Sequence, residues 1–73
     1  AAGDLAGAVE DFSRAIDLDP RSAPARADRG DAHRASGDLT AAIADWMRAL
    51  ELAPPDWPEA ARIRAALEAV GDD

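Results

Sequence analysis

His33 is the single histidine of the chain, and two carboxylates, Asp28 and Asp31, lie within five residues of it. An imidazole and two carboxylates could bind a metal ion or exchange protons near neutral pH. Such chemistry requires all three groups on one face of their helix. On a helix, however, Asp28 and Asp31 lie about 140° or more from His33. The sequence therefore predicts neither a metal site nor an acid–base pair here, and His33 is expected to pack at a partly exposed position.

Other patterns of catalytic residues are equally weak. The sequence holds no Ser/His/Asp set at a plausible spacing and no glycine-rich phosphate loop. It has no cysteine, which excludes a disulfide framework and any cysteine-based metal or redox site. We therefore expect a protein that is not an enzyme, with no catalytic residue, no metal and no cofactor.

Charge and hydropathy limit the possible partners. The formal net charge is −7, from 15 acidic residues and 8 basic residues, all of them arginine. An acidic surface repels phosphate backbones, so we expect no nucleic-acid partner. No apolar run approaches the roughly 20 residues that a membrane helix needs. The alanine- and arginine-rich, lysine-free composition suggests a bacterial source, and the absence of cysteine is compatible with a cytoplasmic location, which is the default expectation.

An internal repeat steps through the chain with an offset of 34 residues. Residues 1–20 and 35–54 are identical at ten of twenty positions, and a third Gly–Asp pair at Gly71–Asp72 keeps the same spacing. The identical pairs are Ala1/Ala35, Gly3/Gly37, Asp4/Asp38, Leu5/Leu39, Ala8/Ala42, Asp11/Asp45, Arg14/Arg48, Ala15/Ala49, Leu18/Leu52 and Pro20/Pro54. A repeat of this length in a helical pattern indicates stacked helical hairpins.

Apolar residues at three- and four-residue spacing predict an all-α fold of four antiparallel helices. The expected helices cover residues 5–17, 23–36, 39–51 and 57–70. Asp4, Ser22 and Asp56 are the expected N-caps, and Glu59 completes a pattern like a capping box with Asp56. Gly37 is expected to end the second helix in a left-handed conformation.

Three larger side chains have predicted structural roles. Trp46 belongs to the apolar stripe of the third helix and is expected in the core. Trp57 is expected to cover the end of that helix. Arg29 should face the first and third helices, where Asp45 and Asp11 are its candidate ion-pair partners.

These residues resemble the tetratricopeptide repeat, a helical hairpin of about 34 residues. The small residues and the terminal proline of the family match Gly30, Ala42, Ala49 and Pro54, and its bulky second-helix residue matches Trp46. The earlier half-repeat supplies Ala8, Phe12, Ala15 and Pro20.

The resemblance implies a single α-solenoid unit over residues 1–73. Residues 1–20 would be the second helix of a preceding repeat, residues 23–56 one full repeat, and residues 57–71 a closing helix. The chain would then be a fragment of a longer array or its C-terminal end.

For function, the resemblance implies a protein–protein interaction scaffold that binds an extended peptide or a partner helix on its concave face. On this chain that groove would consist of Ala27, Asp28, Asp31, Arg34 and Ala35 from the second helix and Ala61, Arg62, Ala65 and Glu68 from the fourth. Independently of the resemblance, the five residues of the second helix share one face. The family's known mode of clamping a C-terminal carboxylate uses Lys and Asn, which this chain lacks.

The alternative function is structural. The chain would be a self-association segment at the end of a longer helical-repeat array attached to another domain. If the helix before residue 5 is missing, the stripe of Leu5, Ala8, Phe12 and Ala15 is partly uncovered. Two outcomes are then expected: the chain self-associates through the first helix, or the first helix frays and the remaining helices loosen.

Overall fold

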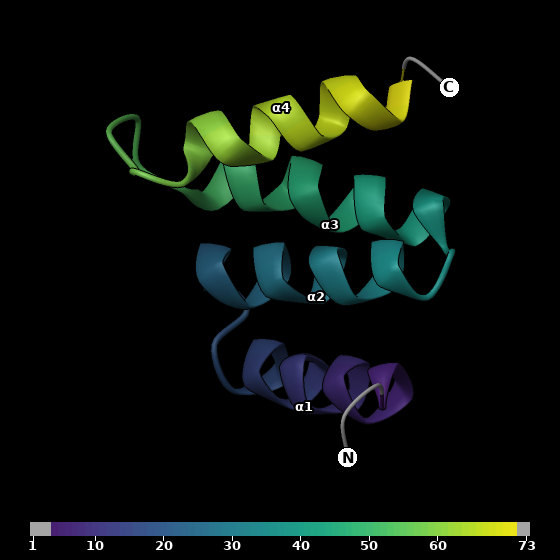
Figure 1. Cartoon of the computed structure of the whole chain (residues 1–73). Coiled ribbons are helices and arrows are strands. Elements are labelled where there is room, and N and C mark those ends of the chain that lie inside the picture. The colour runs from purple at the N-terminus through teal and green to yellow at the C-terminus, as the bar shows by residue number, and fades with distance from the viewer. Residues whose placement is uncertain (1–3, 72–73) are drawn as a thin grey trace.

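A computed structural model describes residues 4–71, and these residues form four helices stacked in chain order (Figure 1). The helices are α1 (Leu5–Leu18), α2 (Ala23–Ala35), α3 (Leu39–Leu52) and α4 (Ala60–Gly71). Each helix packs against the next along the chain, so the predicted all-α stack of hairpins is confirmed. Residues 1–3 of the first repeat copy, and Asp72 of the third Gly–Asp pair, lie outside the described residues.

The predicted caps of the first two helices are confirmed. The Asp4 carboxylate accepts a hydrogen bond from the backbone N–H of Gly7 at 2.8 Å, and the Ser22 hydroxyl accepts one from Ala25 at 3.2 Å. Gly37 follows α2 with a φ of +91°, a left-handed conformation that glycine adopts without steric cost. The two N-caps thus mark where α1 and α2 begin, and Gly37 marks the turn that follows α2.

The start of the fourth helix was predicted wrongly. α4 begins at Ala60 rather than at residue 57, so Asp56 is not its N-cap. Instead the Trp57 N–H donates to the Pro54 carbonyl and the Ala60 N–H to the Trp57 carbonyl, both at 3.1 Å. These bonds, each spanning three residues, are those of two successive tight turns. Within the turns the half-buried Trp57 packs against the core, and this tertiary contact outweighs the capping pattern.

The core lies between α2, α3 and α4. Its two large, fully buried side chains are Trp46 and Ile63, so the core position predicted for Trp46 is confirmed. The buried cluster around them consists of Ala23, Ala27, Ala42, Trp46, Ala49 and Ile63. Because four of these six residues are alanines, the helix backbones can approach closely. At Gly30 the approach leaves no room for a side chain, since a Cβ atom there would lie 2.6 Å from the Trp46 ring.

Candidate functional site

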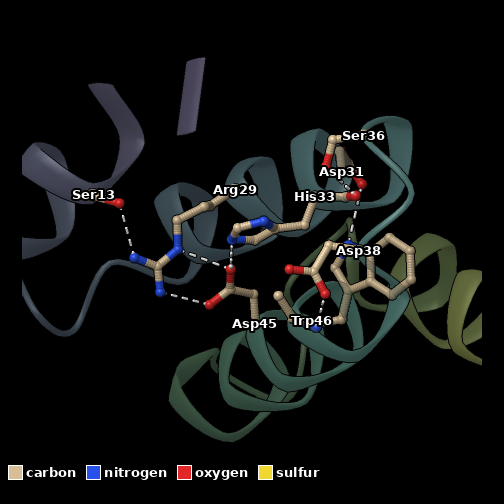
Figure 2. A network of polar contacts seen from close by, with 9 residues as sticks. Ser13, Arg29, Asp31, His33, Ser36, Asp38, Asp45 and Trp46 are labelled. Atoms are coloured by element: carbon tan, nitrogen blue, oxygen red, sulfur yellow. Dashed lines mark hydrogen bonds and ion pairs between the residues drawn. The ribbon is translucent and has the colours of Figure 1, made fainter. Parts of the chain in front are cut away.

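A polar network joins α1, α2 and α3 (Figure 2). Arg29 donates to both carboxylate oxygens of Asp45, from Nε at 2.8 Å and from Nη2 at 2.7 Å. Its Nη1 donates to the Ser13 hydroxyl at 3.1 Å. Asp45 is only 5% exposed, so this two-point hydrogen bonding supplies the pairing that a buried carboxylate requires. The hydrogen bond to Asp45 raises the pKa of Arg29.

Of the two partners predicted for Arg29, Asp45 is confirmed, and Ser13 rather than Asp11 is the partner on α1. The guanidinium is therefore held by neighbouring helices, a structural role. His33 lies beside the same carboxylate, with its Nε2 3.6 Å from Asp45 Oδ2, and is half-buried. In residues 4–71 no three His, Cys, Asp or Glu side chains come together as metal ligands.

A second polar cluster links α2 to α4 through Asp31. The Trp46 Nε1–H donates to Asp31 Oδ1 at 3.1 Å, and Arg62 Nη1 lies 3.2 Å from Asp31 Oδ2. Arg62 also donates from Nη2 to Glu59 at 3.2 Å. The bond from Trp46 to Asp31 was not predicted from the sequence. The signal was available, because a buried indole N–H needs an acceptor.

Asp28 lies at the edge of this second cluster. Its pKa is raised, first by burial and then by the nearby carboxylates of Asp31 and Glu59, while Arg62 acts in the opposite direction. Three carboxylates therefore share one guanidinium. The negative charge that remains makes this part of the surface complementary to a cation. We call Asp28, Asp31, Glu59 and Arg62 the acidic cluster.

Most of the predicted groove residues are at the surface. Exposed members are Asp28, Arg34, Ala35, Ala61, Arg62, Ala65 and Glu68, and Asp31 is half-buried. Ala27 is an exception: its exposed fraction is 0% and it belongs to the core, so a partner cannot contact its side chain. The structure brings Asp28, Asp31 and Arg62 together. The other exposed members lie on α2 and α4. The part of the chain described here holds no closed pocket.

Two further observations complete the description of residues 4–71. No helix there is both long and apolar enough to cross a membrane. Every buried side-chain nitrogen or oxygen in this range has a hydrogen-bond partner. The polar groups that remain available to another molecule are thus those at the surface.

Comparison with known proteins gives one finding. A family model described as the tetratricopeptide repeat matches residues 1–67 of the sequence, a range that includes α1, α2, α3 and most of α4. No curated protein and no solved structure matches the chain significantly.

Proposed function

The chain belongs to the tetratricopeptide repeat family, and from this premise we propose that it binds an extended peptide or a partner helix through the exposed surface of α2 and α4. Domains of this family generally act as protein–protein interaction modules and are typically non-catalytic scaffolds. The observation that carries the proposal is the acidic cluster, where two carboxylates from α2 and that of Glu59, just before α4, lie around one arginine.

The charge of this surface defines the partner. With three carboxylates against one guanidinium, the acidic cluster favours a basic or mixed-charge segment over an acidic one. The attraction acts between largely exposed groups, so it weakens as salt shortens the Debye length, about 10 Å at 0.1 M. We therefore expect weak, salt-sensitive binding.

Small side chains on the same surface leave room for the partner. Ala35, Ala61 and Ala65 are exposed, so side chains of a bound peptide can lie against the helix surfaces between the charged residues. Because they are short, these alanines supply contact area with little loss of side-chain entropy on binding.

A peptide-binding experiment tests the proposal. Immobilised 12-residue peptides of graded net charge are titrated with the 73-residue chain at low and high salt. We expect basic and mixed-charge peptides to bind, and Asp28→Arg to weaken that binding. Asp28 is preferable to Asp31 as the mutated residue, because Asp31 also accepts the Trp46 hydrogen bond. Glu10→Arg on α1 is the matched control and should change nothing. Preferential binding of acidic peptides, or stronger binding of basic peptides by Asp28→Arg, would contradict the proposal.

The structural alternative stays a prediction. The observation that favours it is Leu18 on α1, a large apolar side chain that is 88% exposed. Equilibrium sedimentation of the 73-residue chain tests it, since a monomer at all concentrations would contradict self-association.

A further inference from the structure

Arg62 already places a guanidinium among the carboxylates of the acidic cluster. Its Nη1 donates to Asp31, at 3.2 Å from Oδ2 and 3.4 Å from Oδ1, and its Nη2 donates to Glu59 Oε2 at 3.2 Å. One planar group thereby joins a residue of α2 to the residue just before α4, with a separate nitrogen for each carboxylate. The cluster therefore accommodates a guanidinium, which the chain itself supplies.

The ion pairs of Arg62 lie at the surface. About half of each side chain is exposed to solvent: 48% for Arg62, 42% for Asp31 and 50% for Glu59. Exposed ion pairs of this kind contribute little net free energy, because water and salt screen them and long side chains lose entropy when they form. Another cation can therefore take the place of Arg62 at little cost.

The Asp31 carboxylate, by contrast, is held from the core. Trp46, whose side chain is fully buried, donates its Nε1–H to Asp31 Oδ1 at 3.1 Å. Since a buried indole N–H that loses its acceptor has no water to bond instead, this hydrogen bond keeps the carboxylate in place when its surface partner leaves. Asp31 is therefore a preorganised acceptor, and a cation that arrives from outside meets Oδ2 where Arg62 now meets it.

From these contacts we propose that Arg62 is a built-in competitor for the partner's cation, and that the partner presents an arginine whose guanidinium replaces it on Asp31 and Glu59. The inference rests on the proposed function, because it concerns the same surface. An arginine suits this place better than a lysine, since one planar fork reaches two carboxylates whereas an ammonium is a point charge. In the absence of a partner, Arg62 offsets part of the negative charge and so weakens the attraction for basic molecules that lack a matching arginine.

Fluorescence anisotropy with two labelled 12-residue peptides tests the competition. The peptides are identical except that the basic positions are all arginine in one and all lysine in the other, so their net charges are equal. We expect the 73-residue chain to bind the arginine peptide about threefold or more tightly than the lysine peptide. Arg62→Gln removes the competitor and should tighten binding of the arginine peptide about threefold or more. Equal affinity of the unaltered chain for the two peptides would overturn the inference.

Arg64→Gln is the matched control. It changes the net charge by the same amount, but Arg64 lies two residues further along α4 and therefore about 160° away around the helix axis. Both arginines are exposed, so both variants should fold, which circular dichroism melts verify. Arg64→Gln should leave peptide binding within about 1.5-fold. An equal gain in the two variants would show that only net charge acts, and would overturn the inference while the proposed function stands.

Nuclear magnetic resonance of the chain labelled with nitrogen-15 on arginine detects the displacement directly. The Nε–H signal of Arg62 is identified by its loss in Arg62→Gln. At saturation with the unlabelled arginine peptide, this signal should move toward its position in the double variant Asp31→Asn with Glu59→Gln, where Arg62 has lost both charged partners. An unchanged signal at saturation would overturn the inference alone. If neither peptide binds the chain or Arg62→Gln, the proposed function fails and the inference fails with it.

Discussion

α2 and α4 occupy equivalent places in the repeat, but different chemistry holds them. At matching positions 34 residues apart, α2 has Arg29 and Gly30 where α4 has Ile63 and Arg64. Arg29 makes ion-pair and hydrogen-bond contacts with both neighbouring helices, whereas Ile63 is fully buried in the apolar core. This position of the repeat can therefore hold a charged side chain, provided that hydrogen-bond acceptors lie on both neighbouring helices, as Ser13 and Asp45 do for Arg29.

α2 also has much less apolar side-chain volume than α4. Its buried residues are four alanines and a glycine, while α4 contributes Ile63, Leu67 and Val70 to the core region. α2 is therefore held against α3 by close backbone approach and a two-point ion pair, whereas α4 is held by burial of aliphatic side chains. An ion pair of this kind is weak evidence for net stability, but it fixes the relative positions of its helices.

The packing of α2 and the packing of α4 both depend on Trp46, so its removal should have the largest effect on stability. Its ring contacts Gly30 of α2 and belongs to the same cluster as Ile63 of α4. Trp46→Ala should lower the free energy of unfolding by roughly 3–5 kcal/mol, the range for deleting a buried aromatic side chain. Urea denaturation followed by circular dichroism measures this. Met47→Ala, at a position 55% exposed, is the control and should melt close to the parent.

The ion pair can be replaced by the chemistry of α4. Asp45→Leu alone leaves the Arg29 guanidinium partly buried without its carboxylate, at a cost of about 1.5–3 kcal/mol. The double variant Arg29→Ile with Asp45→Leu makes this contact resemble the one in α4. It should recover most of that loss, since paired apolar replacements are often neutral. A double-mutant cycle from denaturation curves gives the coupling free energy. Additive losses in the cycle would show that the two residues act independently.

Gly30 and Arg64 test the same comparison at a single position of the repeat. Gly30→Ala places a Cβ atom 2.6 Å from the buried Trp46 ring. Overpacking costs about 1–3 kcal/mol, which the helix propensity gained from alanine, about 1 kcal/mol, offsets only in part. Arg64→Ala, at an exposed position in α4, should be nearly neutral. Thermal melts of the two variants measure the difference, and equal melting temperatures would contradict the close approach of α2 to α3.

The smallest effect is expected at Asp28, whose counterpart in α4 is Arg62. The raised pKa of Asp28 means that the folded state binds its proton more tightly than the unfolded state does. Ionisation of Asp28 therefore lowers stability as the pH rises through these pKa values, and the cost is fully present at neutral pH. Asp28→Asn should raise the melting temperature slightly at pH 7. The gain should disappear as the pH falls below the ordinary aspartate pKa of 3.8, and melts across this range measure it.

The sequence predicted those features that a repeated spacing determines. Helix number and the core position of Trp46 follow from apolar residues that recur on one helix face. The pairing of Arg29 with Asp45 follows from the helix faces on which the two residues lie. The start of α4 did not follow, because Trp57 packs against the core and the residues on both sides of it form turns. Capping patterns describe local preference, and here a tertiary contact prevails.

Alanine is the main reason why the surface was harder to predict than the core. The side chains of Ala27 and Ala35 are identical, yet the first is fully buried and the second exposed. With so little difference in hydrophobic area, the sequence carries almost no signal for the face on which an alanine lies. The sequence also did not distinguish Asp11 from Ser13 as the partner of Arg29, because that choice depends on the rotation of α1 about its own axis.

The core cluster of the described residues is drawn from α2, α3 and α4, and this has a consequence for the order in which the chain opens. Detaching α1 requires the loss of the Arg29–Ser13 hydrogen bond and of the contacts of α1 with α2, while the cluster stays closed. Backbone amides of α1 should accordingly exchange with solvent deuterium through a local opening of lower free energy than global unfolding. A molecule that packed against the exposed Leu18 of α1 would slow that exchange, so exchange in this helix would report a bound partner.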